Sequence, residues 1–135
     1  MTDEFRPQYS ADWGDYISFA THMRKEADDQ GVDLLLVDTG DRVDGNGLYD
    51  GSIPKGKHTY DIFKEQNVDI ICTGNHELYE ATTANREWTR TVPNFKENYL
   101  ASNLDIIDPE TGNRTALARR YRKFTTKNRK IEVLG

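Results

Sequence analysis

Two groups of polar side chains, each directly after an apolar run, could do chemistry. Asp41 follows the run that ends at Val37, and Asn75, His76 and Glu77 follow the run that ends at Cys72. A carboxylate, an amide oxygen and an imidazole are ligand types that bind Mn, Mg, Fe or Zn, and one carboxylate can bridge two ions. These residue types therefore indicate a divalent-metal site.

Each of these residues also has a structural interpretation. Asp and Asn after a strand commonly cap a helix or form a turn, and taken singly this is the commoner role. His22 and His58 fall in or near expected helices and are assigned structural roles, whereas Asp38 is close enough to support a ligand. The metal interpretation therefore depends on whether the two groups meet in space.

The expected elements bring the two groups together. Apolar residues at three- and four-residue spacing predict a helix over 12–30, which Gly31 ends. The runs 32–37 and 68–72 are typical of buried strands, and the segment between them is long enough to hold a helix. Such a crossover predicts parallel neighbours whose carboxyl ends lie side by side, where ligands bind in α/β sheets.

The rest of the chain continues the α/β pattern. A helix is expected from Glu80 to about Arg90 with a break at Pro93, followed by a strand over 99–104. The segments 121–125 and 131–134 flank a polar turn and predict a hairpin. The fold class predicted is α/β, with a mostly parallel sheet flanked by helices.

Composition excludes several classes of protein. The 135 residues have the length of one domain, and the single Cys72 cannot form an intramolecular disulfide. A net charge of −5 with an acidic first half argues against nucleic-acid binding. No membrane span is expected, and residues 1–15 lack the apolar core of a signal peptide. We expect a soluble chain whose localisation the sequence leaves unknown.

Two motifs resemble sequence blocks of the calcineurin-like metallophosphoesterase superfamily. They are Gly40-Asp41-Arg42-Val43-Asp44-Gly45 and Gly74-Asn75-His76-Glu77. The segment 99–104 resembles the strand that follows the second block in the 5'-nucleotidase branch. Residues 11–15 and the loop 45–50 are similar to its fungal-type members.

This resemblance implies a fold, an activity and a role for three residues. The chain would form the first half of a four-layer α/β/β/α domain. Asp41 would bridge two divalent metal ions (Mn, Fe, Zn or Mg), Asn75 would bind one of them, and His76 would be catalytic beside the phosphate without binding metal. The binuclear site would activate a hydroxide that attacks phosphorus, in a small phosphoester substrate such as a nucleotide.

The sequence also departs from the family pattern. It lacks an Asp-x-His block before the first helix, and no histidine follows His76. We therefore expect residues 1–135 to be a partial domain, incomplete at both ends, inactive as it stands and prone to self-association. The alternative is a non-catalytic, degenerate phosphoesterase fold that acts as a scaffold or regulator.

Overall fold

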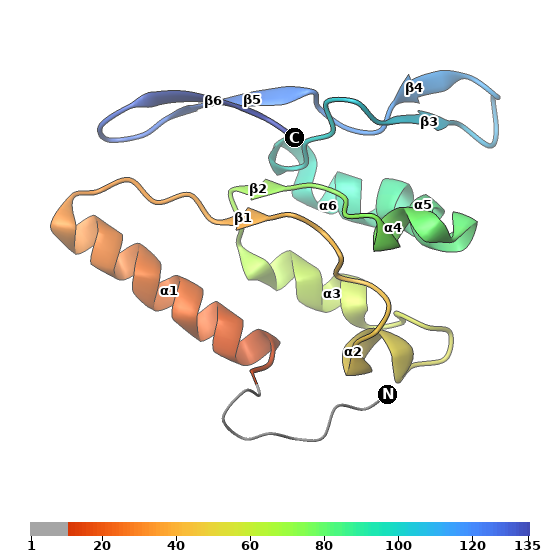
Figure 1. Cartoon of the computed structure of the whole chain (residues 1–135), viewed down its shortest axis with the longest axis horizontal. Helices are drawn as coiled ribbons and strands as arrows, with labels where there is room; N and C mark the ends of the chain where they lie inside the picture. The colour runs from red at the N-terminus through yellow and green to blue at the C-terminus, as the bar shows by residue number, and fades with distance from the viewer. Residues whose placement is uncertain (1–10) are drawn as a thin grey trace.

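The computed structural model describes residues 11–135, and its longest element is helix α1, Trp13–Gln30 (Figure 1). The Asp12 carboxylate accepts the backbone N–H groups of Gly14 and Asp15, and Gly31 ends the helix in the left-handed conformation. Both ends match the prediction. The predictions for residues 1–10, that they hold neither a signal peptide nor an Asp-x-His block, lie outside the described residues.

The remaining elements are short, and the two central strands are parallel. Strand β1 (Val37–Asp38) pairs in parallel with β2 (Ile70–Ile71), as the crossover predicted. The other elements are α2 (Gly47–Asp50), α3 (Thr59–Phe63), η1 (Lys64–Gln66), α4 (His76–Tyr79), α5 (Ala81–Arg86), η2 (Glu87–Thr91), α6 (Val92–Phe95), η3 (Lys96–Asn98), β3 (Asp105–Ile107), β4 (Arg114–Ala116), β5 (Tyr121–Thr125) and β6 (Lys130–Leu134).

The first predicted strand is shorter than its apolar run. Regular pairing covers only β1, whereas residues 32–36 have no regular secondary structure. At Leu36 the backbone N–H donates to the Asp69 carboxylate, 2.8 Å away, rather than to a neighbouring strand. Apolar character therefore indicated a buried segment correctly but placed the start of the strand too early.

The helical segment after the second motif runs through the proline expected to break it. Helix α5, the π-helical turn η2 and helix α6 follow one another without interruption, and Pro93 lies at the start of α6. The Val92 N–H donates to the Glu87 carbonyl five residues earlier, so the wider π turn changes the hydrogen-bond register directly before Pro93. The predicted break at Pro93 is wrong for this reason.

The last third of the chain adds antiparallel pairs to the parallel centre. Tyr99 makes a parallel bridge to Ile71, Leu100 makes one to Arg119, and the predicted strand 99–104 has no longer pairing. Strands β3 and β4 form one hairpin, and β5 and β6 form the other, which is the hairpin predicted around residues 127–129. Figure 1 shows both hairpins along one side of the molecule, with α1 and α3 on the other and β1 and β2 between. The fold class is α/β, as predicted.

Two clusters of buried side chains hold these elements together. One joins Val68 and Ile71 to Tyr99, Ala101 and Leu117. The other packs Val43, Tyr49 and Phe63 beneath the first motif. Within residues 11–135, no helix has both the length and the apolar character needed to cross a membrane.

Candidate functional site

The loops after β1 and β2 meet because the strands are parallel neighbours. Gly40 has φ +93°, and any β-carbon there would overlap the backbone of Thr73 and Gly74. Asp41 itself has φ +59°, a conformation that aspartate adopts more readily than most residues. The first loop therefore approaches the second backbone to backbone, which only glycine at position 40 permits.

Glu77 ties the two loops together from inside the protein. Its buried carboxylate accepts three backbone N–H groups, from Asp41 at 2.8 Å, Arg42 at 2.7 Å and Gly74 at 2.8 Å. Two of these donors belong to the first loop and one to the second. A single buried side chain therefore links the two motifs directly.

Asp41, Asn75 and His76 come together at this junction, as the sequence predicted. The His76 backbone N–H donates to Asp41 Oδ1 at 3.0 Å, and one terminal atom of the Asn75 amide lies 3.3 Å from both carboxylate oxygens. Asp41 and Asn75 are exposed, so their oxygens are open to a ligand. The arrangement presents a carboxylate and an amide side by side at the protein surface.

The His76 imidazole lies between Asp44 and Tyr79. Its Nδ1 is 3.4 Å from Asp44 Oδ2, which is too long for a strong hydrogen bond. The Tyr79 ring packs against the other side, with ring centroids 4.9 Å apart. The ring is partly exposed and has a carboxylate on its Nδ1 side.

A buried charge network supports the first loop from behind. The Arg42 guanidinium donates to Asp38 Oδ1 at 2.9 Å, to the Cys72 carbonyl at 3.0 Å and to Glu87 Oε1. The Tyr99 hydroxyl also donates to Glu87, at 2.7 Å. Arg42 is therefore hydrogen-bonded both to the residue that follows β2 and to the π-helical turn η2.

Burial and charge shift the pKa values in this network in opposite senses. Burial alone would lower the pKa of Arg42, but the Glu87 and Asp38 carboxylates raise it above its ordinary value. Burial raises the pKa of Glu87, against the opposing effects of Arg42 and of the Tyr99 and Thr91 hydroxyl groups. Burial and the Glu87 charge raise the pKa of Tyr99. The network thus contains a permanently charged arginine and a tyrosine that stays neutral.

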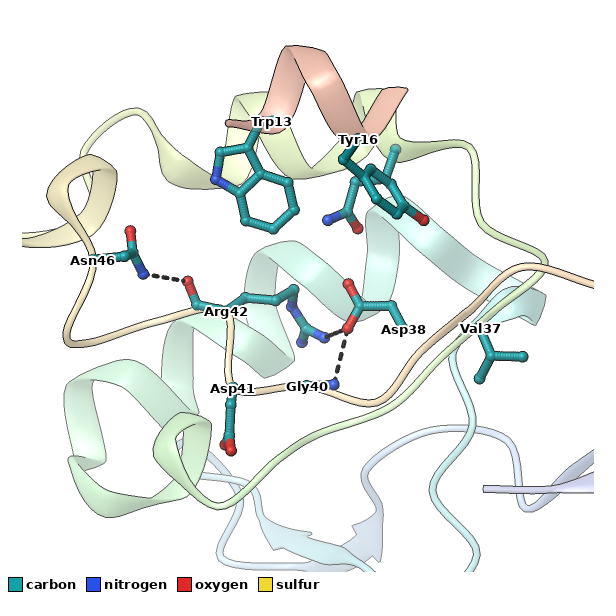
Figure 2. A pocket seen from close by; sticks show the side chains of 9 residues that line it. Trp13, Tyr16, Val37, Asp38, Gly40, Asp41, Arg42 and Asn46 are labelled. Atoms are coloured by element: carbon teal, nitrogen blue, oxygen red, sulfur yellow. Dashed lines mark hydrogen bonds and ion pairs between the residues drawn. The ribbon is translucent and has the colours of Figure 1, made fainter. Parts of the chain in front are cut away.

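A cavity of about 330 Å³ lies between α1 and the first loop. Trp13 and Tyr16 of α1 line it together with Asp38, Asp41, Arg42 and other residues. Figure 2 shows the Asp41 side chain directed away from Trp13 and Tyr16, so its carboxylate does not point into this space. The cavity therefore borders Asp41, whereas Asn75 does not line it.

The donor set at the junction fits part of a divalent-metal site. Carboxylate and amide oxygens suit hard cations, and the two side chains already face each other at 3.3 Å. Within residues 11–135, no group of three His, Cys, Asp or Glu side chains is arranged to hold a metal ion. The described residues thus offer two ligands toward a larger set.

The sequence located this junction but not the side chains that organise it. Asp41, Asn75 and His76 were predicted to converge and do so. Glu77 and Asp44 lie inside the same two motifs, yet neither was given a role. Asp38, which the sequence placed close enough to support a ligand, accepts hydrogen bonds from Gly40 and Arg42. His22 and His58 lie in α1 and at the start of α3, as expected.

An α/β fold that holds these two motifs at the ends of adjacent parallel strands defines a phosphoesterase-type domain. Comparison with protein families agrees, since residues 10–131 match the model described as calcineurin-like phosphoesterase. The chain belongs to this family, as the two motifs had indicated.

Individual relatives of the chain are fungal proteins, and one of them is a 5'-nucleotidase. The chain is similar to a crystal structure of a 5'-nucleotidase from Candida albicans, with 45% identity and a TM-score of 0.79 over 86% of this chain and 22% of that one. A secreted protein of Arthroderma benhamiae is 46% identical over 89% of this chain and 18% of its own length. An uncharacterized Saccharomyces cerevisiae protein is 38% identical over 94% and 21%. The chain thus spans about a fifth of the length of these relatives.

Proposed function

We propose that this chain supplies part of the active site of a metal-dependent phosphoester hydrolase of the 5'-nucleotidase-like branch. The observation that carries the proposal is the meeting of Asp41, Asn75 and His76 at the ends of two parallel strands. Asp41 and Asn75 would contribute ligands to a site for two divalent ions (Mn, Fe, Zn or Mg). The substrate would be a small phosphoester, with nucleotides as the first class to test.

The side chains of this site would divide the work between binding and proton transfer. Divalent ions, when bound, supply Lewis-acid polarisation and a nucleophile derived from water. His76 would stabilise charge on the phosphoryl group and protonate the leaving oxygen, through the nitrogen that does not face Asp44. Glu77 and Arg42 would hold the two loops so that Asp41, Asn75 and His76 stay close together.

The remaining ligands would come from outside these residues. The described part of the chain offers no cluster of three metal-binding side chains, while the relatives are about five times longer. We therefore propose that residues 1–135 form a partial domain with little activity alone. A non-catalytic phosphoesterase fold is the second candidate, and the incomplete ligand set is the observation that favours it.

The decisive experiment is manganese-dependent hydrolysis of p-nitrophenyl phosphate and 5'-AMP. It compares this chain with a longer form, which also contains the segments that are present in the relatives and lie outside residues 1–135. We expect hydrolysis in the longer form, a loss of at least about 100-fold with His76→Ala because a general acid contributes about that much, and no change with His22→Ala. A longer form that is inactive with every phosphoester would support the non-catalytic alternative.

A further inference from the structure

The Asn75 amide group lies between the Asp41 carboxylate and the Tyr79 hydroxyl. One terminal atom lies 3.3 Å from both Oδ1 and Oδ2 of Asp41. The other forms a hydrogen bond with the Tyr79 hydroxyl. Asn75 immediately precedes α4 and Tyr79 ends it, so the two side chains lie one helical turn apart on the same face.

The orientation of the Asn75 amide depends on whether a cation is bound beside Asp41. With its oxygen toward Asp41, as the structure has it, the amide places one acceptor against another. Without a cation the opposite orientation is favoured, because Nδ2 then donates to both carboxylate oxygens. With a cation beside Asp41 the oxygen must face the ion, and Nδ2 must find an acceptor elsewhere.

The Tyr79 hydroxyl is that acceptor. A tyrosine hydroxyl can donate or accept, so it can donate to the amide oxygen in one orientation and accept from Nδ2 in the other. The ring is 64% exposed, yet it packs against the His76 imidazole, which limits the positions of the hydroxyl. Tyr79 thus contacts both Asn75 and His76, the two candidate functional side chains of the second motif.

We propose that Tyr79 is a positioning residue, whose hydroxyl orients the Asn75 amide oxygen toward a bound divalent cation and so strengthens metal binding. This inference rests on the proposed function, because it takes Asn75 to be a metal ligand. Groups that orient a ligand in this way typically change metal affinity about 10- to 100-fold. The hydroxyl matters here, and the ring alone does not supply the effect.

The test is Mn²⁺ binding to the longer form used in the hydrolysis experiment, measured by calorimetry and by electron paramagnetic resonance of the free ion. Tyr79→Phe removes only the hydroxyl of an exposed side chain, so the fold is retained. We expect it to raise the Kd for Mn²⁺ about 10- to 100-fold. Tyr121→Phe is the matched control, because Tyr121 is also an exposed tyrosine and its ring faces Lys123 rather than the site.

Asp41→Asn separates the failure of this inference from the failure of the proposed function. If Mn²⁺ binding is lost with Asp41→Asn but equal in Tyr79→Phe and the wild-type chain, the role of Tyr79 is overturned and the metal site stands. If the wild-type longer form binds no Mn²⁺, or its Asp41→Asn variant binds it as well as wild type does, both proposals are overturned. A weaker affinity in Tyr79→Phe alone, with Tyr121→Phe unchanged, supports the inference.

Discussion

Glu77 is the side chain on which the geometry of the junction most depends. Its two carboxylate oxygens are both used, one by Arg42 and the other by Asp41 and Gly74. Hydrogen bonds to a charged group contribute about 1.5–3 kcal/mol each, and a buried donor left without a partner costs a similar amount. A neutral side chain of the same shape cannot replace this carboxylate, because it has one acceptor oxygen instead of two.

We predict that Glu77→Gln lowers the free energy of unfolding by about 2–4 kcal/mol, because its amide group must face at least one backbone N–H. Urea unfolding measures the loss, and hydrogen exchange shows where it arises. The amide protons of Asp41, Arg42 and Gly74 should exchange faster than in the wild-type chain. Glu80→Gln, at an exposed neighbouring position, is the control. Unchanged protection of these three amides would show that Glu77 does not hold the loops.

Residue types and spacing were enough to find the ligand candidates but not the residue that organises them. Asp41, Asn75 and His76 could be identified because each follows a buried strand and carries a group that binds metal or exchanges protons. The role of Glu77 depends on a carboxylate that turns inward to meet a backbone 35 and 36 residues away. Nothing in the local pattern distinguishes that orientation from the ordinary exposed one.

At the scale of elements, the network of Arg42 and Glu87 joins the first loop to the helical segment 81–95. Both side chains are buried, and the Glu87 carboxylate also accepts the hydroxyl groups of Tyr99 and Thr91. A buried pair of this kind adds little stability over an apolar pair, but removing one partner leaves an uncompensated charge. The network therefore specifies how the loop and the π turn fit together.

We predict that Glu87→Leu lowers the free energy of unfolding by about 3–5 kcal/mol. The buried Arg42 guanidinium then loses one of its two ion-pair partners and keeps only Asp38. Adding Arg42→Met should restore most of the loss, because no buried cation then remains. Urea unfolding of the single and double variants tests both statements. Glu97→Leu is the control, since Glu97 pairs with Arg122 at 3.5 Å on the surface and such pairs contribute about 0–1 kcal/mol. Equal effects of Glu87→Leu and Glu97→Leu would contradict the prediction.

The elements themselves were predicted well where local signals decide them. Helix α1 was predicted from apolar residues at helical spacing and a terminal glycine, and the hairpin β5–β6 from a polar turn. The continuous helix through Pro93 could not be predicted, because it depends on the π turn before the proline. That turn brings Glu87 to Arg42, a contact between residues 45 positions apart.

At the scale of the molecule, the parallel order of β1 and β2 followed from the length of the crossover, but the extent of the sheet did not. A run of apolar residues predicts burial, whereas strand pairing also needs a neighbour with free backbone groups. Within residues 11–135, strand β1 pairs with β2 on one side only, and the segment before it has no regular pairing. The predicted extended sheet is accordingly reduced to a short parallel pair.

This open arrangement leads us to predict self-association of the chain. Val37 in β1 is 51% exposed and Leu134 in β6 is 71% exposed, and a strand with an unpaired edge and apolar side chains readily pairs with another copy. Light scattering over a range of concentrations should show oligomers. Val37→Lys should raise the Kd for association about tenfold, equivalent to about 1.4 kcal/mol, because a charge on an edge strand opposes pairing. Thr115→Lys, on an exposed hairpin strand, should leave it unchanged. A monomer at every concentration would mean that the open edge of β1 is protected within the chain itself.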